Sequence, residues 1–470
     1  MSAPATTEKK YLKWYQKLAY GSGDLASNCS YGLVSSFVLL YLTGTLGLDS
    51  AIIGSLMLAS KVLDGISDVI FGTLIDRTHS KLGKARPWML FGEVGVSLCL
   101  FLLFAIPAGS TTMQYIYFFI VYTALNAVFY TANGIAYSSL VALITKNNNE
   151  RVQLGSFRFM FTVVTNIFMG FAVTGMVEKF GSGAAGWRTT ALIFAIVGLV
   201  VNTISCLAVK ELPEEELSDN TSEAAEEGKA VAKEKKHGFA ETAKILIHNK
   251  YYLMILAIYI VYYIMSNLTT GAGVFCATYY WGDGSLLGQF SMMKMFPVII
   301  ALAIAPVLIK KTGSMQKVNF WGYAISSVLG IPMIYFAMQK NLSMFLLFMF
   351  IKGIFAGTLS GSLNALIAEA SGYTTRTTGI HMDGMMYSCS SLGVKVGGGI
   401  GTAAVGWLLK LGGFVGTATV QSESAIRMIF NLYITFPFVI GIIITVLLAF
   451  LDVEKANKKW DAEHQKEAQA

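Results

Sequence analysis

Residues 189–216 are TTALIFAIVGLVVNTISCLAVKELPEEE, an apolar run that is followed at once by an acidic segment. The run 189–209 is long and apolar enough for one helix to cross the hydrocarbon core of a bilayer. Eleven further runs of this kind occupy most of the chain, so we expect an all-α polytopic membrane protein with twelve transmembrane helices. The predicted spans are 26–46, 51–75, 88–107, 114–143, 155–177, 189–209, 252–280, 286–309, 319–338, 343–368, 384–409 and 428–450.

The composition agrees with this interpretation. Of the 470 residues, 54% are hydrophobic and 13% are charged, and the mean hydropathy is +0.57, values that exclude a soluble domain or a disordered chain. Only 1–17, 211–250 and 452–470 are persistently polar, which leaves no room for a globular enzyme domain outside the bilayer. The five cysteines stand singly in apolar stretches, so we expect helix packing and neither disulfides nor a metal site.

The net charge of +7 comes from lysines and arginines that lie mainly in the loops. They concentrate at both termini, in 211–250 and in every second connection between spans. The alternate connections hold few, namely Lys179, Arg188, Lys340, Lys410 and Arg427. This bias predicts a multi-pass protein of the cell inner membrane with both termini in the cytoplasm, and it indicates no nucleic-acid partner.

The polar segment 211–250 divides the chain into two halves of six spans each. It begins with an acidic cluster and ends with a basic one, so we expect a solvated cytoplasmic linker between an N-terminal bundle, 1–210, and a C-terminal bundle, 251–451, with a cytoplasmic tail over 452–470. The loops after the second and eighth spans echo each other, because both are basic and carry a glycine, Gly83 or Gly313. Two bundles of six helices are the organisation of major-facilitator transporters, although positively charged loops alone would also produce this echo.

Three charged residues lie inside the second span, in Ser60-Lys-Val-Leu-Asp-Gly-Ile-Ser-Asp68. Lys61, Asp64 and Asp68 are three and four residues apart and therefore share one helical face. Two carboxylates one turn apart in a low dielectric need a cation, a neighbouring lysine or a shared proton. We predict a cation-coupling site here; a static ion pair of Lys61 with one aspartate is the alternative.

Other ionisable residues at membrane depth are candidates for function. Lys395 lies in the glycine-rich eleventh span, Gly393 to Gly401, where another helix can approach closely, and it needs a carboxylate such as Asp64 or Asp68. Lys294 and Lys352 have two alternative roles. Each either contacts a substrate or extends its long side chain along the helix to the membrane interface, and the sequence favours neither role.

A sugar site needs planar hydrogen-bonding groups and an aromatic ring face. Tyr130, Asn133 and Tyr137 cluster in the fourth span, and Arg158 begins the fifth. Packing alone would explain the tyrosines, but an arginine beside a tyrosine and an asparagine on adjacent helices favours sugar binding. Further candidates are Asp24 and Asn28, one turn apart in the first span, and Glu93 in the third, which could equally pair with the basic loop after the second span.

These residues resemble the glycoside-pentoside-hexuronide:cation symporters, the family of the melibiose carrier. The similarity runs from Tyr20-Gly-Ser-Gly-Asp24 to Lys395 and is most specific in Lys61 to Asp68 and Asp76-Arg-Thr-His-Ser-Lys-Leu-Gly-Lys-Ala-Arg-Pro-Trp88. The remaining matches are Ile135-Ala-Tyr-Ser-Ser-Leu140, Arg158, Ala368-Glu369, Tyr373, Thr378-Gly379, His381, Asp383 and Tyr387-Ser388.

The resemblance implies a cation site at Asp64 and Asp68, a partner role for Lys395, and sugar contacts at Asn28, Tyr130 and Arg158. It implies a cytoplasmic gate that includes Arg77, Glu369, His381 and Asp383, although the family usually has arginine where His381 stands and often an acid where Gly372 stands.

Other departures bear on the cation and on the sugar. The melibiose carrier has aspartates where Gly134 and Asn28 stand, and tryptophans where Ser138 and Ser360 stand. The missing acid at Gly134 favours a proton over sodium, which prefers several oxygen ligands; Asp64 and Asp68 would be metal ligands only if sodium is the coupling ion.

The expected function is therefore secondary active symport of a glycoside, pentoside or hexuronide with a cation, without a cofactor and by a monomer in the bilayer. A lipid-handling protein or a non-transporting sugar sensor on the same helices is the alternative. No nucleotide-binding loop, HExxH sequence or nucleophile elbow indicates an enzyme. The sequence leaves open the identity of the sugar, its charge and the stoichiometry.

Overall fold

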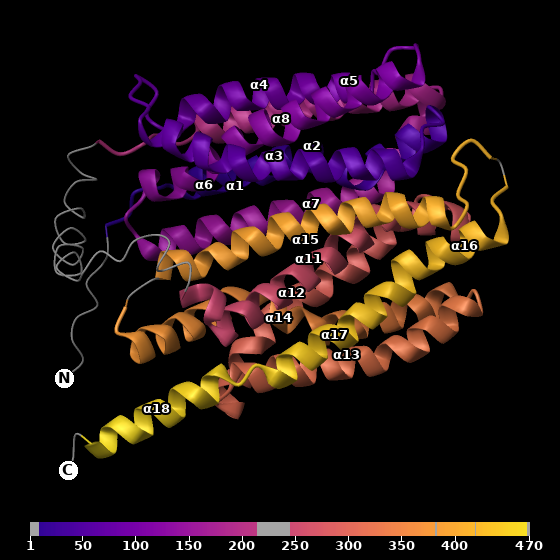
Figure 1. Ribbon diagram of the computed structural model, residues 1–470. Helices are drawn as coiled ribbons and strands as arrows, with labels where there is room; N and C mark the ends of the chain where they lie inside the picture. The colour runs from indigo at the N-terminus through magenta and orange to yellow at the C-terminus, as the bar shows by residue number, and fades with distance from the viewer. Residues whose placement is uncertain (1–8, 214–244, 381–382, 419, 468–470) are drawn as a thin grey trace. The chain divides into compact units, whose positions relative to one another are not determined.

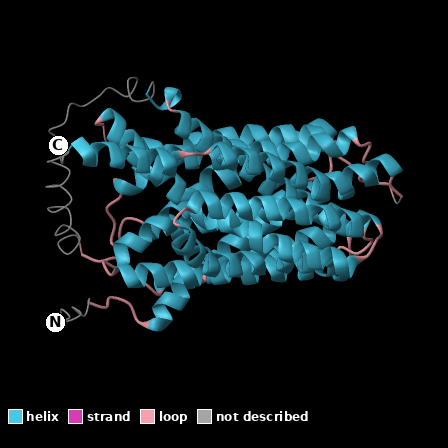
Figure 2. Cartoon of the chain, turned by 90° about the horizontal axis from the view of Figure 1, so that it is seen from below, coloured by secondary structure: helices cyan, strands magenta, loops and turns pink. Residues whose placement is uncertain are grey.

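The computed structural model describes residues 9–213, 245–380, 383–418 and 420–467. Helices and their connections make up this part of the chain, and no strand occurs in it (Figures 1 and 2). The prediction of an all-α protein is confirmed. The linker predicted over 211–250 falls mostly on 214–244, outside the described residues.

Eleven described helical stretches are long and apolar enough to cross a membrane. Helix α3, at 27 residues, is also long enough, although it carries the charged residues Lys61, Asp64 and Asp68. Together they are consistent with twelve spans. The first stretch begins at Trp14, earlier than the hydropathy predicted, and the polar tail contains the helix α18 (Val453–Glu467), which hydropathy did not predict.

Contacts between Cα atoms divide the chain into two units. The first unit comprises residues 1–48 and 59–236, and the second comprises 49–58 and 237–470. The helical segments of the first unit are α1 (Trp14–Gly21), α2 (Gly23–Leu40), η1 (Tyr41–Thr45), the larger part of α3 (Ser50–Asp76), α4 (Arg86–Leu103), α5 (Thr111–Thr123), η2 (Ala124–Tyr130), α6 (Thr131–Ile144), α7 (Asn148–Lys179) and α8 (Gly183–Leu207).

The second unit contains the remaining helices, and residues 49–58 at the start of α3 cluster with it. Ser50 Oγ donates to the carbonyl of Gly406 over 2.9 Å, and Trp407 Nε1 donates to Ser55 Oγ over 3.0 Å. Its segments are α11 (Lys250–Phe275), η3 (Cys276–Tyr280), α12 (Leu286–Thr312), α13 (Met315–Met338), α14 (Leu342–Thr378), α15 (Asp383–Leu411), α16 (Glu423–Phe430), η4 (Asn431–Thr435), α17 (Phe436–Phe450) and α18.

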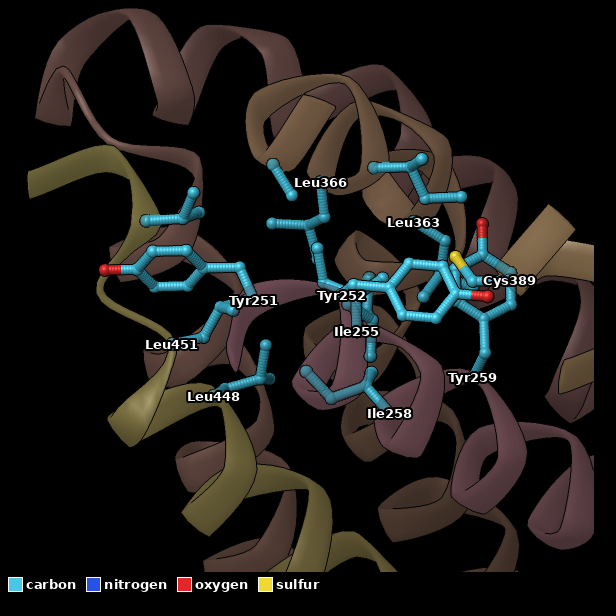
Figure 3. Packing of buried hydrophobic residues seen from close by; sticks show 14 of the residues in the cluster. Tyr251, Tyr252, Ile255, Ile258, Tyr259, Leu363, Leu366, Cys389, Leu448 and Leu451 are labelled. Atoms are coloured by element: carbon cyan, nitrogen blue, oxygen red, sulfur yellow. The ribbon is translucent and has the colours of Figure 1, made fainter. Parts of the chain in front are cut away.

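Apolar side chains pack the interior of each unit. In the second unit, α11 packs on α15, α12 and α13 pack on α14, and α13 also packs on α17 (Figure 1). At one end, side chains from α11, α14, α15 and the α17–α18 connection meet in a buried cluster that includes Tyr252, Ile255, Leu366, Cys389 and Leu451 (Figure 3). All five cysteines of the chain are buried and unpaired, as predicted.

The same polar contact occurs in both halves: a glutamate carboxylate accepts backbone N–H groups at the start of a helix. In the first unit, the Glu211 carboxylate, just after α8, accepts the backbone N–H groups of Lys84, Ala85 and Arg86 over 2.7–3.0 Å at the start of α4. In the second, the Glu454 carboxylate on α18 accepts the Ser314 hydroxyl and the N–H groups of Met315 and Gln316 at the start of α13. Each carboxylate satisfies backbone donors that have no partner within their own helix.

A left-handed glycine precedes each of these helices. Gly83 has φ of 112° and Gly313 has φ of 63°, backbone conformations that side-chain-bearing residues rarely adopt. The loop echo seen in the sequence is therefore more than a bias towards positive charge, since the same glycine and the same kind of carboxylate contact recur in both halves.

Candidate functional site

Arg158 on α7 forms an ion pair with Asp24 on α2 in the first unit. Its Nε donates to Asp24 Oδ2 over 2.7 Å, and its second guanidinium nitrogen donates to Oδ1 over 3.4 Å. The guanidinium carbon lies 4.2 Å from the centroid of the Tyr137 ring on α6. A planar guanidinium held in this way on two sides is preorganised for bidentate hydrogen bonding.

The backbone around this pair is locked by two tyrosines. Tyr20 hydroxyl donates to the carbonyl of Tyr137 over 2.5 Å, and Tyr137 hydroxyl donates to the carbonyl of Tyr20 over 2.8 Å. The Gly-Ser-Gly sequence between α1 and α2 permits this packing: a Cβ at Gly21 would lie 2.6 Å from Phe157 Cβ, and one at Gly23 would lie 2.8 Å from the Tyr137 ring. Gly21 and Gly23, which belong to the motif Tyr20-Gly-Ser-Gly-Asp24, are thus needed because a side chain at either position would clash with its neighbours.

Asn28 continues the polar surface one turn along α2. Its Nδ2 donates to the carbonyl of Asp24 over 2.7 Å and to Thr162 Oγ1 over 3.2 Å, while its Oδ1 accepts from Asn166 Nδ2 over 3.0 Å. Thr162 and Asn166 follow Arg158 at intervals of four residues on α7. Neither residue was predicted from the sequence, although the spacing of polar residues on one face of this transmembrane helix indicates both.

Two predicted sugar contacts have other partners in the structure. The Tyr130 ring stacks on the Tyr31 ring at a centroid distance of 5.7 Å. Asn133 is buried and its Nδ2 donates to Glu93 Oε2. Glu93 therefore pairs with an amide and not with the basic loop; it is 1% exposed, and its Oε1 has no hydrogen-bond partner among the described residues.

Lys61, Asp64 and Asp68 lie on α3 as predicted. Lys61 Nζ lies 3.5 Å from Asp64 Oδ2, and Thr131 Oγ1 on α6 donates to Asp64 Oδ1 over 2.7 Å. Both charged side chains are largely buried, at 19% and 13% exposure. At about 100° per residue, the strongly exposed side chains Val62, Ile66 and Val69 lie on the other side of α3.

The second unit places Lys294 on α12 and Lys395 on α15. Lys294 Nζ is 3.3 Å from both Thr269 Oγ1 and Thr270 Oγ1 on α11. The glycine-rich face of α15 packs against α11, as the sequence predicted: a Cβ at Gly401 would lie 2.6 Å from the carbonyl oxygen of Ile264. Lys395 and the two aspartates belong to different units, so their pairing stays a prediction.

The predicted gate residues are only partly described. Arg77, just after α3, is exposed. Glu369 on α14 accepts from Asn457 Nδ2 on α18 over 2.9 Å, and Arg376 donates to Asn457 Oδ1 over 2.8 Å. His381 and the Asp383 side chain lie outside the described residues. No group of three or more His, Cys, Asp or Glu side chains that could hold a metal occurs among the side chains that the structure describes.

The family model described as MFS/sugar transport protein matches residues 19–455. An isoprimeverose transporter of Lactiplantibacillus pentosus is 27% identical over 100% of this chain and 96% of its own length. YagG of Escherichia coli strain K12, named as a candidate glycoside/cation symporter, is 24% identical over 95% of this chain and 93% of its own length.

Solved structures share the fold. The crystal structure of a bacterial homologue of the human lysosomal transporter Spinster superimposes with a TM-score of 0.67 at 12% identity, over 95% of this chain and 98% of that one. Together with the family match, this makes the chain a multi-pass membrane protein of the major-facilitator fold, a transporter and not an enzyme. The chain belongs to the MFS/sugar transport protein family, and the resemblance to the glycoside-pentoside-hexuronide:cation symporters within it is confirmed.

Proposed function

We propose that this protein carries a sugar into the cell together with a cation, a proton in preference to sodium, by alternating access between its two units. The observation that carries the proposal is the acidic face of α3, where Asp64 and Asp68 lie one turn apart in a helix that also presents exposed apolar side chains. Carboxylates at such a position are costly, and they typically mark an ion or proton pathway. The relatives named for isoprimeverose transport and for glycoside/cation symport support the substrate class.

The coupling site consists of Asp64 and Asp68, with Lys61 and Thr131 as neighbours and Lys395 as the partner from the second unit. Thr131 and Lys61 both contact Asp64, over 2.7 Å and 3.5 Å. Because Asp64 and Asp68 lie one turn apart on the same face, their carboxylates interact, and one can take up a proton while the other stays ionised.

The preference for a proton rests on Gly134. Gly134 is three residues after Thr131 on α6, and a Cβ added to it would have no described heavy atom within 4 Å besides its chain neighbours and its own helix backbone. The position where the resembling carrier has an aspartate therefore has room for a side chain but supplies no side-chain oxygen. A sodium ion wants several oxygen ligands, whereas a proton needs one carboxylate.

The sugar site is centred on Arg158, with Asp24, Asn28 and Tyr137 around it. Guanidinium, carboxylate and amide groups there can exchange their mutual hydrogen bonds for bonds to sugar hydroxyls. Tyr130 and Asn133 are further contacts of the first unit, and Lys294 is the contact proposed from the second. Arg77, Glu369, His381 and Asp383 form the cytoplasmic gate.

The topology follows the positive-inside bias. The N-terminal bundle 1–210 and the C-terminal bundle 251–451 are joined by a cytoplasmic linker, 211–250, and followed by a cytoplasmic tail, 452–470. The protein is a monomer in the cell inner membrane, with both termini in the cytoplasm and with no cofactor besides the coupling ion.

A pH recording tests the coupling directly. De-energised cells that express the protein are suspended in weak buffer, and external pH is followed after addition of glucosides, galactosides, xylosides or glucuronides, with and without sodium. Alkalinisation with one sugar in sodium-free medium is expected. Uptake that requires sodium and moves no protons would reverse the cation preference, and the absence of any sugar movement would overturn the proposal.

A further inference from the structure

A cavity of about 180 Å³ lies inside the second unit, among α11, α12, α13, α14 and the η4–α17 segment. Two lysines line it, Lys294 from α12 and Lys352 from α14. Counted at about 1.5 Å per residue, Lys294 is ~12 Å from the first residue of α12, and Lys352 is ~15 Å from the first residue of α14. Because half the thickness of the hydrocarbon core is about 15 Å, both ammonium groups belong to the membrane interior.

The cavity offers these lysines hydroxyl groups and no carboxylate. Lys294 Nζ has only the two threonine hydroxyls at 3.3 Å, and Lys352 has no hydrogen bond or ion pair with any residue that the structure describes. Among the lining residues that the structure describes there is no Asp, Glu or His. Besides the two lysines, the polar lining consists of serine, threonine and tyrosine side chains: Ser266, Thr269, Ser326, Ser327, Ser360, Tyr262, Tyr323 and Tyr433.

The helices that carry the lysines touch each other closely at this point. A Cβ at Gly353, the residue after Lys352, would lie 2.8 Å from Pro297 Cβ, three residues after Lys294. One turn further, a Cβ at Gly357 would lie 2.7 Å from Ala301 Cβ. The two lysines therefore start from neighbouring turns of packed helices and extend into the same space.

Two like charges that share a low-dielectric cavity repel each other, and each has lost water without gaining an opposite charge. An anion between them would relieve both penalties. Oxyanions suit such a site best, because several oxygens can accept from two ammonium groups and from the surrounding hydroxyls at once. A neutral sugar would leave both charges uncompensated.

We propose that this cavity is a binding site for a small oxyanion, held between Lys294 and Lys352. The oxyanion is either the carboxylate of an organic solute or a free inorganic anion. The site lies wholly within the second unit, so it does not depend on the cation-coupling proposal. Through Lys294 it deepens the proposed sugar site, because it assigns an anionic group to the ligand bound at that lysine.

Binding to the purified full-length protein in detergent tests this site. Isothermal titration at fixed chloride compares D-glucuronate with D-glucose, which differ in the carboxylate, and includes inorganic sulfate. We expect at least one of the two anions to bind tenfold or more tightly than glucose. Tighter glucuronate identifies an organic carboxylate, and tighter sulfate identifies an inorganic anion; equal affinity of all three would overturn the proposal.

Variants localise the binding. Lys294→Met and Lys352→Met should each weaken the preferred anion at least tenfold, whereas Lys340→Met, in the α13–α14 connection of the same unit, should leave it unchanged. Anion affinity retained in both cavity variants would place the anion elsewhere and refute the site.

The unfolding temperature, measured with and without the anion, tests the site even if a variant binds no anion. Removing an uncompensated buried charge should raise the unfolding temperature of the anion-free protein, and the preferred anion should then stabilise the wild type but not Lys352→Met. Lys352→Gln serves if the methionine variant aggregates. A lower unfolding temperature for both Lys352 variants without anion would contradict an uncompensated charge at this position.

Discussion

The two units differ in how they treat charges inside the membrane. In the first, cations have carboxylates of the same unit: Arg158 has Asp24, Lys61 has Asp64, and Lys17 has Glu150 at 3.0 Å. In the cavity of the second, Lys294 has two threonine hydroxyls, and none of the described residues that line the space it shares with Lys352 is an acid. The units nevertheless repeat the carboxylate contact that caps α4 and α13.

This contrast distinguishes residues that stabilise the fold from residues that bind ligands. The repeated glycine and carboxylate of Gly83 with Glu211 and of Gly313 with Glu454 fix a loop in each half. The buried charges do not repeat, so they are where the two halves have acquired different tasks. A ligand in the first unit has to compete with existing ion pairs, whereas an anion in the second supplies a missing partner.

The largest expected effect is the loss of the charges on α3. Asp64→Asn and Asp68→Asn should each abolish concentrative uptake but leave at least some exchange or binding, because asparagine keeps an acceptor for the Thr131 hydroxyl and removes the titrating group. Accumulation and counterflow of labelled sugar measure the two properties separately.

Asp76→Asn is the matched control, since Asp76 is the last residue of the same helix and is exposed. It should accumulate sugar normally. Normal accumulation in both of the other variants would show that coupling does not use this face of α3.

Breaking the ion pair of the first unit comes next. Arg158→Ala removes charge-assisted hydrogen bonds and should weaken sugar binding about 10- to 100-fold. It also leaves Asp24 without its cation, so the amount of folded protein should be checked by size exclusion. Equilibrium dialysis gives the affinity, and Arg151→Ala, two turns earlier on α7, is the control. Unchanged affinity in Arg158→Ala would move the sugar site away from α7.

Restoring an acid on α6 has a smaller expected effect. Gly134→Asp places a carboxylate where a Cβ has open space, on the face of the helix that carries Thr131. Sodium should then stimulate uptake severalfold at a fixed pH, measured against choline as the replacement cation. Gly155→Asp, at another position with no atom within 4 Å, controls for a general effect of charge. Equal responses of the two variants would argue against a cation ligand at position 134.

The fold could be predicted from the sequence because bilayer length, apolar runs and basic loops follow from local composition. Candidate residues such as Arg158 and Asp64 could also be predicted, since an ionised group in an apolar run is conspicuous. The Gly-Ser-Gly connection and the glycines of α15 could be recognised in the sequence as motifs. The atoms that a side chain at these positions would clash with are seen only in the structure.

The partners of these residues could not be predicted. The hydrogen bond from Asn133 to Glu93 could not be predicted, because which faces of α4 and α6 meet depends on the packing of whole helices. Hydropathy likewise misplaced the start of the first span, since Lys17 lies inside a helix where Glu150 compensates it. Lys352 gave no decisive signal, because only the cavity shows that it faces no carboxylate.

The repeated carboxylates offer a test of equivalence. Glu211→Ala and Glu454→Ala each leave several N-terminal amides of a helix without an acceptor, so each should cost about 1–2 kcal/mol of stability. Thermal unfolding in detergent should show a similar decrease of a few degrees for both. The adjacent Leu212→Ala is a control for truncation alone. A loss confined to one variant would mean that the two contacts, despite their likeness, are not equivalent.

The smallest expected effect concerns an exposed pair of the second unit, Asp49 and Lys410, whose Oδ2 and Nζ atoms are 2.6 Å apart. Partial burial raises the pKa of Asp49, but the Lys410 ammonium and N–H groups of Ala51 and Ile52 outweigh it, so the pKa lies below its ordinary value. A lowered pKa stabilises the folded state above the unfolded value of about 4, and this contribution disappears as pH falls through the folded value. Asp49→Asn should therefore lower the unfolding temperature slightly at pH 7, by the equivalent of at most about 1 kcal/mol, and less at pH ~3 or in 1 M KCl. A decrease that is the same at both pH values would show that the contact acts through its hydrogen bonds and not through its charge.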